Sequence, residues 1–469
     1  MQRLGPQDTL MVASEAAGWV QSNGSLAIYD DSRVNGGLTL ERLREYMRLR
    51  TRHIPIYRQR LVAVPGNIGR PSWVEVDHLD VSRHVTEIAV PHPGTPDQVA
   101  ALVCGLIEKP MDMTIPLWHI YLLRGLEGGT VGVFSMLHHA ASDGVRGQLI
   151  QAALYDLDPD GPLDRAGDGV PGVGSRVPGR GELLAGAARE WAGMPVTAAR
   201  AGIAVGRAGA RTAGLVARSL GRDLPGRAPR VRFNARIGEQ RTFAYGSIPL
   251  APLKAWVKAR GGTVNDGILT VTGGALRRYL DEIGELPTAP LIAAIPVGHV
   301  EGVDNPSAGG NSWSVMTAGI GTDVADPEER MRRVVAGTAA AKRRDKAMGP
   351  TLLGDLMFLP PVVTTAVAGA YRRSGLSRYQ PPSTNVTVSN VRGSPVPIYL
   401  AGAELLASHP FGPVADGMGL NITLLSYRDR IDIGISSSPD IVEDPWQILE
   451  AFRTELDHLR TERDQKERS

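Results

Sequence analysis

The stretch that most constrains the fold of this chain is MLHHAASDGVRG, residues 136–147. The run before it, TVGVFSML at 130–137, is uncharged and β-prone, which predicts a buried strand. After Asp143 and Gly144 the apolar residues recur at helical spacing, at Val145, Leu149, Ile150, Ala153 and Leu154. The two adjacent histidines therefore lie on a strand-to-helix turn, where a rigid scaffold can hold a functional side chain.

Several roles are possible for the residues of this turn. Ser142 or Asp143 could cap the helix, and Gly144 keeps a side chain away from an approaching substrate. Zinc ligands are usually spaced by two to four residues, whereas His138 and His139 are adjacent, and no HExxH motif occurs. A G-x-S-x-G elbow is also absent from the sequence. We therefore expect neither a metal site nor a serine nucleophile.

Bulk properties favour a large soluble or surface-bound intracellular chain. With 469 residues and 42% apolar composition, two cores are more plausible than one. The single cysteine, Cys104, excludes an intramolecular disulfide and suits a reducing compartment. The N-terminus has only a short apolar run at Leu10–Ala13 between Asp8 and Glu15, so we expect no signal peptide. No run of 18 apolar residues predicts a spanning helix.

Composition divides the chain into four segments. Residues 1–155 form a first subdomain with a strand at 24–29 and a helix capped by Thr39. Residues 156–230 begin with a Gly/Pro-rich linker and continue as a helical connector. Residues 231–460 form a second subdomain, and 461–469 are a charged tail.

The connector is strongly basic. Residues 181–241 hold eleven arginines and four acids, a local charge of +7 in a chain of net charge +2. Arg200, Arg207, Arg211, Arg218 and Arg222 fall within roughly 60° on a helix, opposite Val205, Val216 and Leu220. Such a helix could lie on an anionic lipid surface, or it could pack on its own protein with a solvated basic face. Aromatic residues are scarce and no nucleic-acid-binding motif occurs, so we expect no nucleic-acid partner.

A second apolar segment, residues 348–371, contains Asp355 as its only charge. Pro360-Pro361 would break a helix there, so a spanning helix is not expected. The segment could dip into a bilayer edge or form part of the core.

The histidine motif resembles a known signature. His138-His139-Ala-Ala-Ser-Asp143-Gly144 matches HHxxxDG of the CoA-dependent acyltransferase superfamily. Other motifs resemble the bacterial wax ester synthase/diacylglycerol acyltransferase family, namely the N-terminus, Pro116-Leu117-Trp118 (PLW), Asn265-Asp266 (ND) and the segment from Ser389-Asn390. One departure is that Arg392 and Ser394 replace the two prolines of the usual SNVPGP.

The resemblance implies an α/β fold of two chloramphenicol-acetyltransferase-like subdomains with mixed sheets and an active site at their interface. It implies His139 as the general base, with His138, Asp143 and Gly144 shaping the turn. A neutral imidazole, of pKa near 6.5, can accept a hydroxyl proton at pH 7. No metal and no cofactor beyond the acyl-CoA substrate is implied.

Two of the remaining motifs have two interpretations each. Thr263-x-x-Asp266 predicts a capping box, which puts Asn265 in the first turn of a helix. There Asn265 could stabilise an oxyanion, or it could merely cap the helix with Asp266. The PLW element could form a packed turn or line an acyl tunnel (Pro116, Leu117 and Trp118). A substrate-binding loop is expected at Ser389 and Asn390.

The function expected from these features is transfer of a long-chain acyl group from acyl-CoA to diacylglycerol, a fatty alcohol or both. The expected location is the cytoplasm, with peripheral contact to the inner face of the membrane or to lipid inclusions. Two rivals remain open: an acyltransferase or condensation-type enzyme that uses carrier proteins, and a non-catalytic lipid-surface protein.

Overall fold

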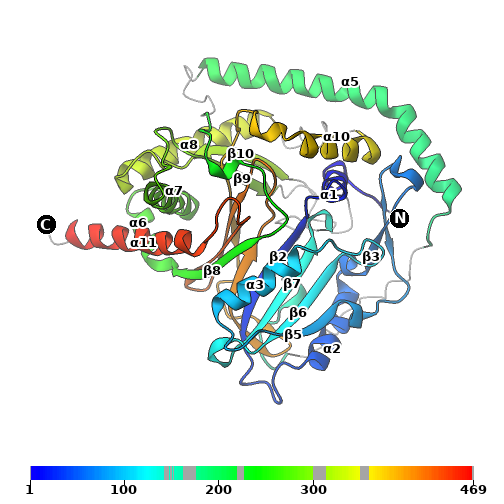
Figure 1. Cartoon of the computed structure of the whole chain (residues 1–469), viewed down its shortest axis with the longest axis horizontal. Coiled ribbons are helices and arrows are strands. Elements are labelled where there is room, and N and C mark those ends of the chain that lie inside the picture. Colours follow the sequence, from blue (N-terminus) through cyan, green and yellow to red (C-terminus); the bar gives the residue numbers. More distant parts are fainter. Residues whose placement is uncertain are drawn as a thin grey trace.

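The computed structural model describes residues 2–141, 147, 150, 153–161, 176–218, 227–298, 313–348 and 359–466. Two six-stranded sheets and one small sheet organise these residues. In Figure 1 the N-terminal half lies at the lower right, the C-terminal half lies at the left, and one long helix runs along the top.

The first large sheet is mixed. Its order is β12 (Tyr399–Leu400), β13 (Ala403–Phe411), β2 (Ser22–Asp30), β7 (Val131–His138), β6 (Trp118–Arg124) and β5 (Val85–Ala89). Only the β5–β6 pair is parallel among these neighbours. The predicted strands at 24–29 and 130–137 are confirmed as β2 and β7, which pair with each other.

The second large sheet is also mixed. Its order is β10 (Trp313–Gly319), β9 (Ile292–Gly298), β11 (Val386–Arg392), β14 (Leu420–Tyr427), β15 (Arg430–Ser437) and β8 (Thr242–Pro249). Here β9–β11 and β11–β14 are parallel, and the other pairs are antiparallel. The third sheet contains β1 (Gln2–Arg3), β4 (Ser72–Glu75) and β3 (Gln59–Val62). The predicted α/β class with mixed sheets is confirmed.

Helices cover the sheets. The described helices are α1 (Pro6–Ala16), α2 (Leu40–Arg50), α3 (Pro96–Ile107), α5 (Arg180–Arg218), α6 (Leu250–Lys258), α7 (Val264–Glu282), α8 (Pro327–Met348), α10 (Pro361–Ser374) and α11 (Trp446–Lys466). The predicted cap of α2 is confirmed, because Thr39 Oγ1 accepts a hydrogen bond from the backbone N–H of Arg42. One core is formed mainly by the C-terminal half, and two more are formed mainly by the N-terminal half, with Leu405 and Phe411 of β13 contributing to them.

The two large sheets meet through β13. This strand comes from the C-terminal half of the sequence, yet it pairs with β2 in the N-terminal sheet. Gly434 of β15 allows it to pass closely, since a Cβ there would lie 1.6 Å from the carbonyl oxygen of Pro410. The boundary predicted at residue 231 stays a prediction, although β12 and β13 from beyond it belong to the first sheet.

A buried carboxylate marks this junction. Asp432 of β15 accepts hydrogen bonds from the backbone N–H of Ser408 (2.8 Å) and from Ser247 Oγ (2.6 Å). Burial raises the pKa of Asp432 to about 6, and the two hydrogen bonds oppose that rise only in part. The contact ties β13 to the second sheet.

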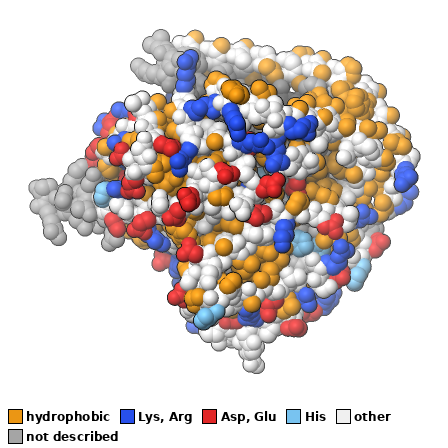
Figure 2. All heavy atoms as spheres, in the orientation of Figure 1, with side chains coloured by type: hydrophobic (Ala, Val, Ile, Leu, Met, Phe, Trp, Pro, Cys, Tyr) orange, Lys and Arg blue, Asp and Glu red, His pale blue; other side chains and the backbone are white. Residues whose placement is uncertain are grey.

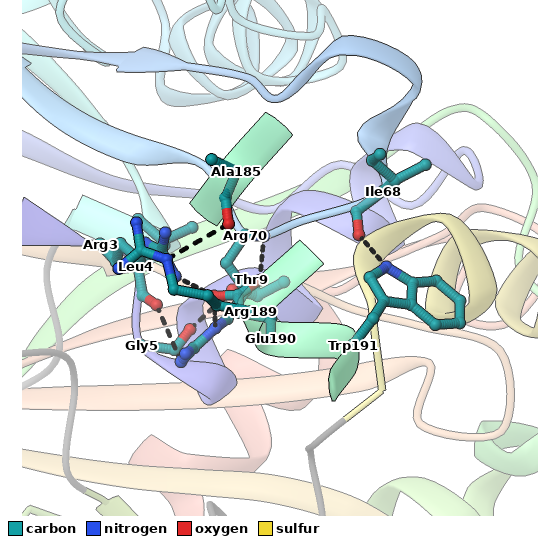
Figure 3. Close-up of polar contacts among 10 residues, drawn as sticks. All are labelled: Arg3, Leu4, Gly5, Thr9, Ile68, Arg70, Ala185, Arg189, Glu190 and Trp191. Carbon is teal, nitrogen blue, oxygen red and sulfur yellow. Dashed lines mark hydrogen bonds and ion pairs between the residues drawn. The ribbon is translucent and has the colours of Figure 1, made fainter. Parts of the chain in front are cut away.

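Helix α5 spans much of the upper surface in Figure 1. Its N-terminal third is held by side chains, as Figure 3 shows: Glu190 Oε1 lies 2.9 Å from Arg3 Nη1 and 3.1 Å from Arg70 Nε. The indole N–H of Trp191 donates to the carbonyl of Ile68 at 2.7 Å. Further along, α5 packs on α8, and the small side chains of Ala201 and Ala208 are buried. The predicted helical connector is confirmed as far as residue 218, whereas residues 220 and 222 lie outside the described residues.

Candidate active site

The two histidines lie where β7 ends between β2 and β6. His138 is the last residue of β7, and the short 3-10 turn η6 (His139–Ala141) follows it. The backbone N–H of His138 donates to the carbonyl of Leu117 at 3.0 Å, and the backbone N–H of His139 donates to the carbonyl of Gln21 at 2.7 Å. Neighbours on both sides therefore fix the backbone of the motif.

The His138 side chain is completely buried. Its Nδ1 accepts a hydrogen bond from the backbone N–H of Ala140 at 3.0 Å. A neutral ring bonded in this way carries its proton on Nε2. That Nε2 lies 2.8 Å from Glu15 Oε2 of α1, with the N–H directed off the line between the two atoms. The Glu15 carboxylate therefore makes a close contact with the Nε2–H dipole rather than a well-formed hydrogen bond.

The His139 side chain is half-buried, unlike that of its neighbour. A substrate can therefore approach it while its backbone stays fixed. Asp143 and Gly144, together with Ser142, lie outside the described residues. In the helix predicted after them, Gly147, Ile150, Ala153 and Leu154 are helical.

The PLW element packs directly beneath the motif. Pro116 and Leu117 are buried, and Trp118 is 1% exposed. The Trp118 indole donates to the carbonyl of Tyr57 at 2.9 Å, and its ring stacks on His84 at 4.2 Å between centroids. These contacts favour the packed interpretation of Trp118, while the Leu117 carbonyl supports His138.

The predicted capping box of α7 is confirmed. Thr263 Oγ1 accepts from the backbone N–H of Asp266, and Asp266 Oδ2 accepts from the backbone N–H of Thr263 at 3.0 Å. Asp266 Oδ1 also accepts from Thr338 Oγ1 of α8 at 2.8 Å. The buried Asp266 side chain thus fixes the start of α7 from two directions.

Asn265 lies in the first turn of α7 and is half-buried. Its Oδ1 accepts a hydrogen bond from Asn390 Nδ2 of β11 at 3.4 Å. Two separately predicted residues are therefore brought together across the second subdomain. With its oxygen occupied, Asn265 presents its NH2 group as the side that can donate to a ligand.

Two further residues complete the segment after β11. Ser389, beside Asn390 in β11, is half-buried and pairs with Thr423 of β14. Arg392 continues β11 as its last residue, where the family pattern has proline. Ser394 Oγ accepts from the backbone N–H of Val396 at 3.2 Å and donates to its carbonyl. Side-chain bonding of Ser394 stabilises this turn in place of proline rings.

Glu15 was not predicted as a site residue. Its carboxylate is 5% exposed, and it accepts from the backbone N–H groups of Gln21 and Met111, each at 3.3 Å. The only signal in the sequence is an acid two residues after the short apolar run Leu10–Ala13, 123 residues away from His138. Short-range motif spacing cannot detect such a contact.

The part of the chain that the structure describes shows neither a metal-ligating cluster nor a membrane-spanning helix. Within those residues, no group of three or more His, Cys, Asp and Glu side chains is arranged to hold a metal ion. No helix among them is long and apolar enough to cross a bilayer.

The class is defined by two mixed sheets covered by helices, by the crossing of β13 into the first sheet, and by an HH motif at the end of a central strand. This chain has the fold of the CoA-dependent acyltransferases and condensation domains. The first condensation domain of the calcium-dependent antibiotic synthetase matches this fold with a TM-score of 0.58 at 18% identity, over 98% of this chain and 96% of that one.

The family follows from the sequence comparisons. The wax ester synthase/diacylglycerol acyltransferase catalytic domain matches residues 4–268, and the C-terminal domain of the same family matches residues 309–460. The chain belongs to the wax ester synthase/diacylglycerol acyltransferase family and is an acyltransferase of that family.

Relatives cover nearly the whole chain. A Mycobacterium tuberculosis H37Rv protein, provisionally named a diacylglycerol O-acyltransferase, is 31% identical over 98% of this chain and 90% of its own length. A second one is 35% identical over 94% of this chain and 93% of its own. The structure of a wax ester synthase/diacylglycerol acyltransferase from Marinobacter aquaeolei VT8 has a TM-score of 0.69 at 26% identity, covering 98% and 99%.

Proposed function

We propose that this protein transfers a long-chain acyl group from acyl-CoA to diacylglycerol, a fatty alcohol or both, with His139 as general base. The observation that carries this proposal is the contrast between the two histidines. The His138 ring is wholly buried and accepts a hydrogen bond from Ala140. The His139 side chain is half-buried, while its backbone N–H donates to the carbonyl of Gln21 at 2.7 Å. A base needs both a fixed position and access to its substrate.

The chemistry requires one proton to move twice. His139 takes the proton of the acceptor hydroxyl as the oxygen attacks the thioester carbonyl, which forms a carbon–oxygen bond. When the carbon–sulfur bond breaks, the imidazolium returns the proton to the CoA thiolate. Each transfer by a positioned side chain contributes about 10²–10⁴-fold to the rate.

Asn265 is the proposed donor to the oxyanion that forms between these steps. Its Oδ1 accepts from Asn390, which leaves its NH2 group as the donating side. The N-terminal end of α7 adds a positive dipole at the same position. Preorganised donors of this kind stabilise the transition state without reorganisation during the reaction.

Two rivals make different predictions. A condensation-type enzyme would require an acyl chain tethered to a carrier protein, and a lipid-coat protein would have no turnover. The assay supplies radiolabelled palmitoyl-CoA with dioleoylglycerol or hexadecanol and measures labelled ester and released thiol together. Equal amounts of ester and thiol support the proposal; no release with either acceptor would defeat it.

We also propose that α5 contacts the lipid surface on which such water-insoluble acceptors reside. Its outward face carries Val196 and Ile203, each 55% exposed and two helical turns apart. Figure 2 shows hydrophobic and uncharged side chains along this upper rim and basic side chains gathered beneath it. An exposed apolar face flanked by arginines suits insertion at an anionic interface.

The arginine stripe of α5 supports the same proposal. Arg200, Arg207, Arg211 and Arg218 are exposed, and none forms an ion pair with a residue that the structure describes. Val205, predicted to lie opposite these arginines on the helix, is 43% exposed, compared with 55% for Val196 and Ile203. Contact with the inner face of the membrane or with lipid inclusions remains part of this proposal.

Helix α10 extends this surface. Both α5 and α10 contact the 3-10 turn η3 (Pro65–Asn67), so the two helices share one side of the molecule. Val362 and Val367 of α10 are exposed, in a segment for which the sequence left the core and the bilayer edge open. The described part of that segment favours the exposed surface.

A further inference from the structure

We propose that Glu15 is a positioning residue for the catalytic base, holding His138 on one side and the backbone that carries His139 on the other. This inference rests on the proposed role of His139. Glu15 belongs to α1, outside all of the motifs that carry the family resemblance except the general N-terminal pattern.

Glu15 reaches the motif by two routes. Its Oε2 lies 2.8 Å from Nε2 of His138, the residue directly before the base. The same oxygen accepts from the backbone N–H of Gln21 at 3.3 Å, and the carbonyl of Gln21 accepts from the backbone N–H of His139 at 2.7 Å. One carboxylate thus constrains both the ring before the base and the strand beside it.

The contacts around this carboxylate all require an acceptor. Gln21 and Met111 present backbone N–H groups, and His138 presents Nε2–H because its Nδ1 accepts from Ala140. A carboxylate accepts from the two backbone groups and attracts the positive end of the Nε2–H dipole at 2.8 Å. An amide would turn an NH2 group toward at least one donor, which leaves a buried conflict of the kind that costs about 1–3 kcal/mol.

The backbone of Glu15 is itself fixed. Just after α1, the carbonyl of Ala17 accepts from Arg372 Nη1 of α10 at 3.2 Å, and Trp19 contacts the ring of Tyr371. Gly18 makes this close approach possible with φ of +98°, where a Cβ would lie 1.7 Å from the Arg372 guanidinium. The end of α1 is therefore held between α10 and the histidine motif.

The test compares Glu15→Gln, Glu15→Asp and wild type in the palmitoyl-CoA assay, with His139→Ala as the inactive reference. Glu75→Gln is the matched control, because Glu75 is also partly buried and lies 2.9 Å from Arg58, away from the motif. For Glu15→Gln we expect kcat to fall about tenfold to hundredfold, as small displacements of reacting groups do, with an unchanged KM for palmitoyl-CoA. Glu15→Asp, which keeps the charge, should recover part of this loss, and Glu75→Gln should match wild type.

Three results would overturn the inference: wild-type kcat in Glu15→Gln, a loss confined to KM, or no recovery in Glu15→Asp. An inactive wild type would instead defeat the proposed function. If Glu15→Gln does not fold, 15N NMR of histidine-labelled wild type at pH 7.5 tests the same point, with His138→Gln to assign the signal. We expect the Nε2–H tautomer for His138; the Nδ1–H tautomer would contradict the proposed contact.

Discussion

The histidine motif and helix α5 are held to the protein in opposite ways. His138 and His139 sit at the end of a central strand and are fixed by backbone bonds to Leu117 and Gln21. Among the described residues, polar side chains hold helix α5 near its N-terminal end, and further along it packs on α8, with Ala201 and Ala208 buried. The first arrangement suits chemistry that needs fixed geometry, and the second suits a surface that adapts to lipid.

This difference implies that catalysis and lipid contact can be separated by mutation. The residues proposed for turnover are half-buried around β7 and the start of α7, whereas those proposed for lipid contact face outward.

His139→Ala should have the largest effect. Loss of the general base should lower kcat by about 10³-fold, within the range that a positioned base contributes. The variant should keep its far-ultraviolet circular dichroism and its binding to phosphatidylglycerol vesicles. Turnover within tenfold of wild type would remove His139 from the proposed role.

The double variant Val196→Glu with Ile203→Glu should weaken lipid contact and leave catalysis intact. Two carboxylates on the outer face of α5 oppose both insertion and the attraction of the arginines to anionic lipid. We expect vesicle binding, measured by cosedimentation, to fall about tenfold or more. Turnover of hexanol, an acceptor that dissolves in water, should stay within twofold of wild type.

The matched control for this variant is Leu157→Glu, which alters an apolar side chain that is 73% exposed outside α5. It should bind vesicles like wild type. Equal losses in both variants would show a general effect of added negative charge and would contradict a specific role for α5.

Asp432→Asn tests the junction on which the fixed geometry depends. Because burial raises the Asp432 pKa to about 6 from an ordinary 3.8, the native state binds its proton more tightly than the unfolded state does. The free energy of unfolding should therefore fall as the pH rises from about 4 to about 6. At pH 8 the variant should be more stable than wild type by at most about 3 kcal/mol, and this gain should vanish near pH 4.

Chemical denaturation at pH 4, 6 and 8 measures this effect. Asp429→Asn, whose side chain is 82% exposed on the neighbouring turn, is the control and should show no pH-dependent gain. A gain for Asp432→Asn that is the same at all three pH values would contradict the raised pKa.

Glu190→Gln should have the smallest effect. It weakens the contacts with Arg3 and Arg70 that hold the start of α5, and partly exposed ion pairs contribute up to about 1 kcal/mol each. Hydrogen exchange should quicken in the amides near residues 183–190, while β7 stays protected. Faster exchange in β7 as well would show that the two regions are not independent.

Local sequence patterns predicted much of this structure. The strand at 130–137, the cap at Thr39 and the box of Thr263 with Asp266 all follow from neighbouring residues, and each is present. Periodicity also predicted the α5 helix, because a helix is specified by residues close in sequence.

The features that the sequence did not predict depend on long-range packing. The entry of β13 into the first sheet, the contact of Glu15 with His138 and that of Asn390 with Asn265 join residues more than 100 positions apart. The sequence left open whether α5 packs on its own protein or lies on lipid for a similar reason. Periodicity gives the faces of a helix, but α8 decides which face is covered.

The separation of catalysis from lipid contact is tested by measuring turnover and lipid binding on the same phosphatidylglycerol vesicles, which contain dioleoylglycerol and labelled palmitoyl-CoA. His139→Ala should bind the vesicles like wild type and form no triacylglycerol above background. Triacylglycerol formation by His139→Ala at the wild-type rate would contradict the role of His139 as general base.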